Sequence, residues 1–519
     1  MAITTEAVRS RVVVDPPETL STDIAIVGSG MGGGTLSFAL KDTGARVLLI
    51  EQGDFLPTER ENWSPEAVHL DQRYKNSASW YDPATGKSFV PGNYHYVGGN
   101  TKLYGATLPR FRAHDFEPIE HVDGVSPGWP FTYADLEPYY GEVEQMFWVH
   151  GNKGEDPTDP WRSTGYPFPG ISHEGATARL AATAKTMGLH PFSAPQAVDW
   201  RDGGACVLCD TCDSFPCMVG AKGDADTCAV RPALLSGNVW LLTNAQAIRL
   251  ETDTTGRHVT SAQVTCGGRR IRVRAHRFVL ACGAVNTAAL LLRSASSIHP
   301  RGLANSSDQV GRNFMSHLTT FLVGVDPRRK NGAVYQKTLG INDWYSTGPT
   351  TKYPLGNIQA LGKLRGPQAK LAQPRVPLAV LDEVTKYSVD VLAQSEDLPV
   401  AESRVTLTTN GQVSLDRRET NTFAHRELVK RTSKLLRRSG FPIILTRNLG
   451  VEATSHQCGT ARMGEDAQSA VVDPQLRAHD VGNLWIADSS TFPASAALNP
   501  ALTIAALSLR LGRSGALSS

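Results

Sequence analysis

The segment from residue 23 to residue 51 constrains the fold more than any other part of the chain. It reads DIAIVG, continues through the glycine-rich turn GSGMGG into GGTLSFALKDTG, and ends with ARVLLIE. The first and last stretches have the apolar pattern of buried parallel strands, and the stretch between them predicts a helix over 33–44 that is closed by Gly44. This order of strand, helix and strand predicts an α/β fold with a parallel sheet.

The turn in this unit has the spacing of a dinucleotide-binding fingerprint. Gly28, Gly30 and Gly33 follow the pattern G-x-G-x-x-G. In such a turn the first glycine permits the tight bend, the second lets the backbone approach a pyrophosphate, and the third lets the helix pack close to the strand. Glu51 ends the second strand, where a carboxylate can accept hydrogen bonds from an adenosine ribose. The pattern predicts dinucleotide binding and does not distinguish NAD from FAD.

Length, charge and hydropathy exclude several classes of protein. With 519 residues the chain is long enough for two to three domains' worth of packed structure. Its 52 basic and 50 acidic residues give no field that would attract nucleic acid or an anionic membrane. The N-terminus lacks the apolar segment of a secretory signal, and no apolar run reaches the length of about 18 residues that a membrane span needs. We therefore expect a cytoplasmic protein that acts on a small molecule, with its eight cysteines as free thiols.

The rest of the chain divides by its patterning. Residues 55–200 are rich in Trp, Tyr, Pro and Gly without sustained periodicity, which indicates long excursions over a binding site. The segment 270–295 again predicts strand, turn and helix, a return to the nucleotide domain. Residues 318–445 combine the strand-like TTFLVGV and SRVTLTTNGQVSLD with a basic amphipathic helix near 422–438. That combination predicts a separate substrate domain built on a sheet.

Three further segments carry a resemblance to a known family. YHYVGGNTKLYGATLPR (94–110), VGRNFMSH (310–317) and the run from 456 to 510 resemble the glucose-methanol-choline (GMC) oxidoreductases, which are FAD enzymes. The resemblance implies a Rossmann-like FAD-binding domain of residues 20–150, 200–317 and 450–519. It also implies a discontinuous, sheet-based α+β substrate-binding domain of residues 151–199 and 318–449, after an N-terminal leader of residues 1–19.

Within the family, two loops are most similar to one bacterial branch. These are GGNTKLYGA and the cysteine-rich CVLCDTCDSFPCMVGAKGDADT. The branch contains pyranose oxidases, glycoside 3-oxidases and the large subunits of sugar-acid dehydrogenases. The resemblance therefore implies a sugar or glycoside as substrate.

The resemblance implies two catalytic residues. His456, in SHQCGT, matches the active-site base near the flavin N5, and an imidazole with a pKa of about 6.5 suits the removal of a hydroxyl proton. Taken alone, this histidine could equally cap a turn. Asn499 matches the family's second active-site His or Asn, and LNPALTIAAL is also an ordinary helix start with Asn499 as N-cap and Pro500 at N1. Both readings of Asn499 can hold, because such a helix would direct its positive end at the flavin.

The resemblance also implies a set of cofactor contacts. Residues expected at the flavin or its ribityl and adenosine parts, besides the fingerprint glycines and Glu51, are Gly98, Gly99, Asn100, Thr101, Ala247, Asp488, Pro500 and Thr503. Some relatives link the flavin through a histidine of the 100–106 loop. NTKLYGA contains none, so we predict non-covalent FAD and a structural role for His95.

The cysteines leave more than one interpretation open. Cys458 is expected to be a packing residue, because His456 is matched to an alcohol-oxidising role and not to activating a thiol. Cys206, Cys209, Cys212 and Cys217 have the spacing C-x2-C-x2-C-x4-C. This spacing is close to an iron–sulfur run, is compatible with a zinc loop and also fits a loop of purely structural cysteines. We predict no metal site.

The expected reaction is oxidation of a secondary sugar hydroxyl to a ketone, with C3 of a glycoside favoured over C2. Hydride would pass to flavin N5, and O2 would reoxidise the flavin to give hydrogen peroxide. The alternatives are a dehydrogenase that delivers electrons to a quinone or cytochrome, and a non-catalytic flavin redox sensor. Candidate substrate contacts, without assigned positions, are Tyr335, Trp344, Tyr345 and Lys352. The oligomeric state is not predicted.

Overall fold

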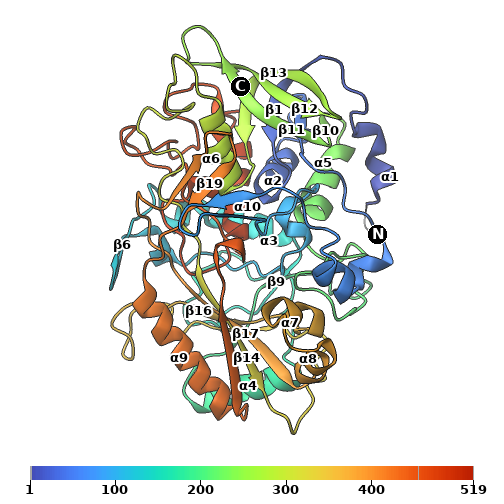
Figure 1. The fold of residues 1–519 in the computed structure, drawn as a ribbon, viewed down its shortest axis with the longest axis vertical. Helices are drawn as coiled ribbons and strands as arrows, with labels where there is room; N and C mark the ends of the chain where they lie inside the picture. The colour runs from blue at the N-terminus through green and yellow to red at the C-terminus, as the bar shows by residue number, and fades with distance from the viewer. Residues whose placement is uncertain (1–2, 454, 518–519) are drawn as a thin grey trace.

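Two large sheets organise the chain. The computed structural model describes residues 3–453 and 455–517, with one sheet in the upper half of Figure 1 and the other in the lower half. The upper sheet has seven strands in the order β10-β2-β1-β13-β12-β11, with β21 also paired to β13. Its strands are β1 (Thr19–Val27), β2 (Val47–Ile50), β10 (Val239–Leu242), β11 (Ala245–Thr252), β12 (Val259–Cys266), β13 (Arg269–Leu280) and β21 (Leu484–Ile486).

The predicted strand–helix–strand unit is confirmed, with one correction to the helix. β1 pairs in parallel with both β2 and β13, and the helix between β1 and β2 is α2 (Met31–Ala39). The predicted range 33–44 was wrong at both ends. The helix begins directly after Gly30, and it ends early because the N–H and the Oγ–H of Thr43 both bond to the carbonyl of Leu40. Gly44 lies beyond the helix, in the turn that leads to β2.

The lower sheet has six strands in the order β20-β14-β17-β16-β15-β8. They are β8 (Phe192–Ser193), β14 (Leu318–Val325), β15 (Leu339–Ile341), β16 (Asn357–Ala360), β17 (Ser388–Ser395) and β20 (Ile443–Asn448). The helices α4 (Gly175–Thr186) and α9 (Thr422–Arg438) pack on one face of this sheet, as the lower part of Figure 1 shows. The predicted amphipathic helix over 422–438 is confirmed.

The alternation of side chains along the lower strands separates its two faces. Ile358 of β16 and Val391 and Ala393 of β17 belong to the apolar core under α4 and α9. Their neighbours Gln359 and Gln394 are buried and hydrogen-bonded to each other. Because successive residues of a strand point to opposite faces, these amides lie on the face away from the helices.

A four-stranded sheet lies apart from both. Its order is β18-β19-β3-β4, with β3 (Trp80–Asp82), β4 (Lys87–Phe89), β18 (Arg404–Leu407) and β19 (Val413–Asp416). The predicted substrate-binding range 318–449 includes the β18–β19 hairpin. The hairpin nevertheless pairs with β3 and packs on α6 (Ala284–Arg293), the helix that follows β13.

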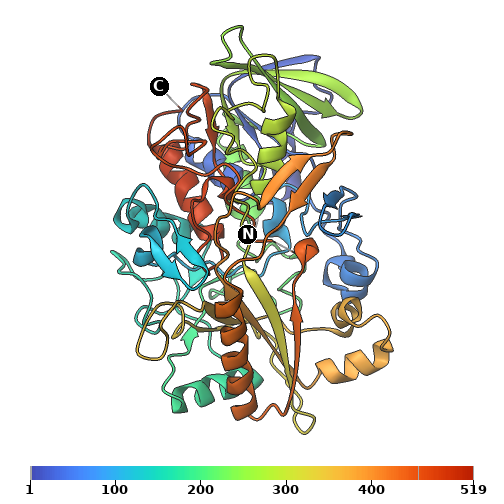
Figure 2. The same ribbon diagram turned by 60° about the vertical axis from the view of Figure 1, so that its left-hand side comes forward.

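The remaining elements connect these layers. Two short pairs are formed by β5 (Ile119–His121) with β6 (Gly124–Ser126) and by β7 (Val149–His150) with β9 (Gln196–Ala197). The other helices are α1 (Thr5–Val8), α3 (Tyr133–Met146), α5 (Arg231–Leu235), α7 (Gly366–Ala372), α8 (Leu378–Thr385) and α10 (Ala501–Arg513). Single 3-10 or π turns lie at 9–11, 60–63, 66–70, 99–102, 113–116, 226–230, 451–453 and 489–491. The C-terminal helix α10, red in Figure 2, packs against α2 and α3 and so returns the chain end to the upper sheet.

Candidate active site

The fingerprint glycines lie at the end of β1 and the start of α2. Gly28 has φ +103°, and a Cβ there would lie 2.3 Å from the carbonyl oxygen of Ala281, which directly follows the neighbouring strand β13. A Cβ on Gly33 would lie 1.8 Å from the carbonyl oxygen of Gly28, so helix and strand approach closely only because this residue is glycine. Gly30 is the N-cap of α2 and provides no side-chain cap. The first N–H groups of α2 are therefore left for an anion.

Glu51 is joined to this turn through a residue that the sequence reasoning missed. Its carboxylate accepts hydrogen bonds from the Ser29 N–H at 3.0 Å, the Ser29 hydroxyl at 2.6 Å and the Gly53 N–H at 3.0 Å. The N–H of Gly98 in turn donates to Ser29 Oγ at 3.2 Å. Burial raises the pKa of Glu51. Ser29 occupies a variable position of the fingerprint, so its spacing gave no signal.

The predicted flavin loop touches the fingerprint turn. Gly98 and Gly99 have φ +93° and +56°, and a Cβ on Gly99 would lie 3.1 Å from the Cα of Gly30. The side chain of Asn100 accepts from the Tyr94 N–H at 2.8 Å, and Thr101 bonds to the Gly98 carbonyl and to the Ala225 N–H. The two polar side chains thus shape the loop from within, and the glycines form its surface toward Gly30.

The C-terminal cofactor candidates lie around the start of α6 and α10. Asp488 accepts from the Gly283 N–H at 3.0 Å and the Thr287 hydroxyl at 2.6 Å, and burial raises its pKa. Thr503 is buried and hydrogen-bonded to the Tyr140 hydroxyl at 2.8 Å. Ala247 lies on β11 at a register shift, and β11 begins beside Glu51, whose carbonyl accepts from the Ala245 N–H.

These residues fit FAD. The uncapped N-terminus of α2 suits a pyrophosphate, and the glycine pair at Gly30 and Gly99 leaves backbone without side chains where a ligand must approach. The buried Glu51 carboxylate lies next to the fingerprint turn, where it can face the adenosine part of the cofactor. Covalent attachment is not decided, and non-covalent FAD stays a prediction. The backbone of His95 packs on Gly53, consistent with the structural role expected for this histidine.

His456 forms a pair with a second histidine to which the sequence reasoning gave no role. Its Nδ1 lies 2.9 Å from Nδ1 of His317, and the two rings meet edge to face with centroids 4.8 Å apart. Gln394 Nε2 lies 2.8 Å from His317 Nδ1 and 3.0 Å from His456 Nδ1. His317 was present in the segment VGRNFMSH, which was used only for the family resemblance.

Both histidines are held neutral. Burial lowers the pKa of His317 to about 4. Burial lowers the pKa of His456 well below its usual value, and repulsion from a protonated His317 and from Lys337 lowers it further. An imidazole that stays unprotonated near neutral pH can accept a proton. The pair therefore has the electrostatics of a general base.

Asn499 joins the same cluster, and its predicted N-cap role was wrong. The N-cap of α10 is Pro500, and no side chain caps this helix. The Oδ1 of Asn499 instead accepts a hydrogen bond from Gln359 Nε2 at 3.0 Å. Among the hydrogen bonds formed by the described residues, none uses Nδ2 of Asn499. Its two hydrogens are thus available for a bound molecule.

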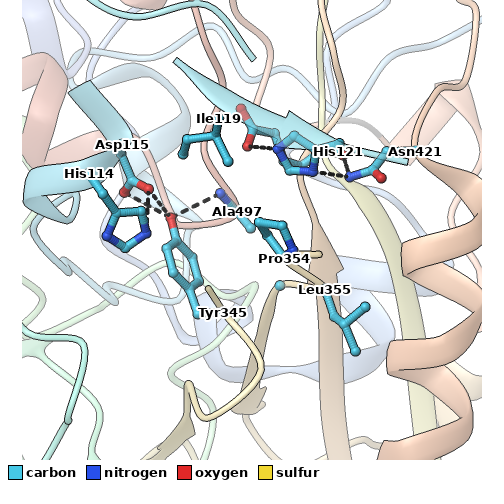
Figure 3. Close-up of a pocket in the computed structure, with 11 residues that line it drawn as sticks. His114, Asp115, Ile119, His121, Tyr345, Pro354, Leu355, Asn421 and Ala497 are labelled. Carbon is cyan, nitrogen blue, oxygen red and sulfur yellow. Dashed lines mark hydrogen bonds and ion pairs between the residues drawn. The ribbon is translucent and has the colours of Figure 1, made fainter. Parts of the chain in front are cut away.

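A cavity beside this cluster contains one of the predicted substrate contacts. Tyr345 donates to Asp115 at 2.8 to 2.9 Å, and its oxygen accepts from the Ala497 N–H at 3.4 Å, two residues before Asn499 (Figure 3). Across the cavity, Glu396 lies 3.2 Å from His121 Nε2. Burial raises the pKa of Asp115. The cavity is acidic and adjoins the site without including His456 or Asn499.

A second cavity, on the side of the cysteine loop, contains Tyr335. It also contains Cys212, Asp213 and Lys337, whose Nζ lies 2.8 Å from Asp213 Oδ2. A Cβ on Gly105 would lie 2.3 Å from Lys337 Nζ, so this ion pair touches the predicted flavin loop. Lys337 is a further residue that sequence reasoning missed.

Two other predicted contacts lie elsewhere. Trp344 packs into the core under α4 and α9, beneath the Arg431 guanidinium, and Lys352 is exposed over the ring of Tyr353. Neither lines one of the two cavities. Aromatic or basic character alone could not have separated them from Tyr335 and Tyr345.

The cysteines are free thiols throughout the described part of the chain. Cys458 is buried, and burial raises its pKa well above the usual value, which fits the packing role expected for it. Burial also raises the pKa of Cys212 to about 12. Within residues 3–453 and 455–517 no group of three or more His, Cys, Asp or Glu side chains has an arrangement that could hold a metal ion.

Comparison with known proteins identifies the family. Two sequence profiles described as GMC oxidoreductase match residues 75–319 and 399–508. The 6'''-hydroxyparomomycin C oxidase of Streptomyces lividus is 33% identical over 526 residues, covering 95% of this chain and 90% of its own. The chain belongs to the GMC oxidoreductase family. FAD is the cofactor typical of that family.

Other relatives are named as oxidoreductases of sugars or amino sugars. The paromamine 6'-oxidase of Streptomyces fradiae is 31% identical, covering 94% of this chain and 90% of its own. The fructose dehydrogenase large subunit of Gluconobacter japonicus is 28% identical, covering 95% and 97%. The protein is thus similar over nearly its whole length to oxidoreductases of alcohol groups.

Solved structures share the fold. Pyridoxine 4-oxidase from Mesorbium loti matches with a TM-score of 0.69 at 19% identity, covering 95% of this chain and 98% of that one. Formate oxidase matches with a TM-score of 0.67 at 16% identity, covering 96% and 98%. These matches confirm the predicted fold class, a Rossmann-like FAD-binding part with an antiparallel-sheet substrate part. No helix of the described residues is both long and apolar enough to cross a membrane.

Proposed function

We propose that the protein is an FAD-dependent oxidase of a hydroxyl group on a sugar or amino sugar, with O2 as electron acceptor. FAD, when bound, supplies the hydride acceptor for this chemistry. Removal of one proton and one hydride converts the alcohol to a carbonyl, and the same two electrons and two protons convert O2 to hydrogen peroxide. The observation that carries the proposal is the neutral pair of His456 and His317 beside the free amide of Asn499.

Each group in this cluster has a distinct task. His456 accepts the proton of the substrate hydroxyl, because its lowered pKa keeps it unprotonated at neutral pH. Asn499 Nδ2 donates to the oxygen as negative charge develops there. The alternative of a non-catalytic redox sensor gives neither residue a task.

The relatives named for paromomycin and paromamine favour an amino sugar as the substrate. The paromamine oxidase is named for the 6' position, which differs from the ring carbon C3, or C2, that we expect from the loop resemblance to glycoside 3-oxidases and pyranose oxidases.

Product analysis distinguishes these possibilities. The FAD-loaded protein would be incubated with paromamine, glucose and a 4-nitrophenyl glucoside, and the oxidised carbon identified by NMR together with oxygen uptake. Oxidation of paromamine in preference to glucose supports the amino-sugar assignment. A 3-keto product from the glucoside alone would favour the glycoside branch, and no oxidised product from any sugar would contradict the proposal.

A dehydrogenase is the second candidate, because the fructose dehydrogenase large subunit is among the relatives. In that case electrons would leave to a quinone or cytochrome. Oxygen uptake measured beside reduction of an artificial dye separates the two. An oxidase consumes O2 at a rate that accounts for substrate turnover, whereas a dehydrogenase needs the dye.

A further inference from the structure

A chain of buried side-chain amides leads from a carboxylate to the histidine pair. Asp156, the four amides and His317 are buried, His456 is half-buried, and each member is hydrogen-bonded to the next. In order, the members are Asp156, Asn342, Asn357, Gln359, Gln394, His317 and His456. The amides come from the lower sheet and the segments beside it, on the face turned away from α4 and α9.

Asp156 fixes the direction of the first links. It is ion-paired with the buried Arg112 and can only accept, so the Nδ2 of Asn342, 2.7 Å away, must face it. The Oδ1 of Asn342 then accepts from Asn357 Nδ2 at 2.6 Å, and the Oδ1 of Asn357 accepts from Gln359 Nε2 at 3.1 Å. Reversing any one amide would bring two oxygens or two N–H groups together.

Gln359 is the most constrained member. Three side-chain oxygens converge on its Nε2, from Asn357, Gln394 and Asn499. A reversed Gln359 would place its own oxygen against all three, which would take the donor from each of these acceptors. Gln394 must therefore present its oxygen to Gln359 and its Nε2 to the histidines.

Two contacts fix the tautomer of His317. Gln394 Nε2 lies 2.8 Å from its Nδ1, and the carbonyl oxygen of Ser495 lies 3.4 Å from its Nε2. A carbonyl accepts only and an amide N–H donates only. Neutral His317 therefore has its hydrogen on Nε2 and a lone pair on Nδ1.

The tautomer of His456 follows from that of His317. The two Nδ1 atoms are 2.9 Å apart, a hydrogen-bond distance that requires one hydrogen between them. Since Nδ1 of His317 has no hydrogen, the hydrogen belongs to Nδ1 of His456, and the one lone pair of His317 Nδ1 is shared between this donor and Gln394 Nε2. In the competing arrangement Gln394 donates to both Nδ1 atoms, and two lone pairs then face each other at 2.9 Å without a hydrogen. The 3.0 Å approach of Gln394 to His456 is thus a contact without a hydrogen bond.

We infer that the carboxylate-anchored amide chain from Asp156 to Gln394, acting through His317, holds His456 as the Nδ1–H tautomer with its basic lone pair on Nε2. This inference rests on the proposed function for its purpose, since Nε2 is then the atom that takes the substrate proton. On proton transfer, the resulting imidazolium donates a charge-assisted hydrogen bond to His317 Nδ1. Gln359 also orients Asn499, because its donation to Oδ1 turns the Asn499 N–H groups away from the chain. The chain members are positioning residues, and none of them need touch the substrate.

Two substitutions separate hydrogen-bond direction from added charge. Asn357→Asp and Gln394→Glu each replace a buried amide of the chain with a carboxylate. At position 357 the carboxylate loses the donation to Asn342 but can still accept from Gln359, so the direction of every later link is kept. At position 394 it can no longer donate to His317.

The readout is the histidine ring-nitrogen spectrum of FAD-loaded, 15N-histidine-labelled protein, with His456 assigned from its loss in His456→Asn. We expect a protonated Nδ1 and a bare Nε2 for His456 in the wild type and in Asn357→Asp. In Gln394→Glu we expect this signature to be lost, through protonation of the pair or a change of tautomer. Melting curves show whether each variant is folded.

Three results would overturn the inference. These are a bare Nδ1 on His456 in the wild type, an unchanged signature in Gln394→Glu, or equal changes in both variants. If neither variant folds, the wild-type spectrum alone decides between the two tautomers. The measurement uses no substrate, so a protein with the expected tautomer that oxidises no sugar would refute the proposed function and leave this inference intact.

Discussion

Gly99→Ala tests whether the two glycine turns hold FAD. At φ +56° an alanine costs about 1–2 kcal/mol of folding free energy. The added Cβ would also lie 3.1 Å from the Cα of Gly30, against about 3.5–4.0 Å for an unstrained contact, so the turns must separate by roughly 0.5 Å. That displacement is at the limit of what a preorganised site tolerates. We expect FAD to bind about tenfold more weakly, a loss of about 1.4 kcal/mol.

Gly86→Ala is the matched control. Gly86 has φ +70° in the β3–β4 hairpin, and a Cβ there would meet nothing within 4 Å. It therefore incurs the backbone cost alone. FAD affinity would be measured by flavin fluorescence quenching on apoprotein, and stability by urea unfolding. Equal FAD affinities in the two variants would refute the assignment of Gly99 and Gly30 to the cofactor site.

Further predictions concern buried charge. His317 and His425 have pKa values that burial lowers to about 4, below their unfolded value of about 6.5. The unfolded chain then binds more protons between these values, so stability is complete above pH 6.5 and falls toward pH 4 by about 3 kcal/mol per histidine. Burial raises the pKa of Asp397 to about 6, which has the opposite effect on stability and offsets the loss from about one histidine. The urea midpoint should fall between pH 7 and pH 5, and an unchanged midpoint would contradict this. Arg110→Met should cost about 3–5 kcal/mol, because the fully buried Arg110 is ion-paired with Glu137 at 2.9 Å and its loss removes this cation from a buried carboxylate, whereas Glu144 keeps its ion pair with Arg162. A urea-derived loss below about 1 kcal/mol would be inconsistent with that burial.

Strands and helices whose hydrophobic pattern lies within one short segment could be predicted from the sequence. The apolar runs around the fingerprint turn and the amphipathic helix over 422–438 were found because their periodicity is carried by neighbouring residues. The end of α2 was missed, because a side-chain hydrogen bond from Thr43 overrode the expectation that Gly44 closes the helix. The fold class followed from these units and from the family resemblance.

The support of the active site could not be predicted in the same way. Gln394 lies 62 positions from His456, and Gln359 lies 140 positions from Asn499. Their approach depends on the pairing of β16 with β17 and on the return of the C-terminal segment to that sheet. The sequence nevertheless contained an indication of these residues, since a glutamine in an apolar strand needs hydrogen-bond partners when it is buried. The indication was stronger for His317, because this residue ends a segment that resembles the family.

The most direct test of the account is flavin reduction without oxygen in His456→Ala. The FAD-loaded variant would be mixed anaerobically with a sugar that bleaches the wild-type flavin. His299→Ala serves as control, because the ring of His299 bonds to the carbonyl of Gly256, in the loop between β11 and β12 of the upper sheet. The account predicts a 10²- to 10⁴-fold slower loss of flavin absorbance, roughly the scale for a lost general base, with FAD retained. An unchanged rate in His456→Ala would contradict it.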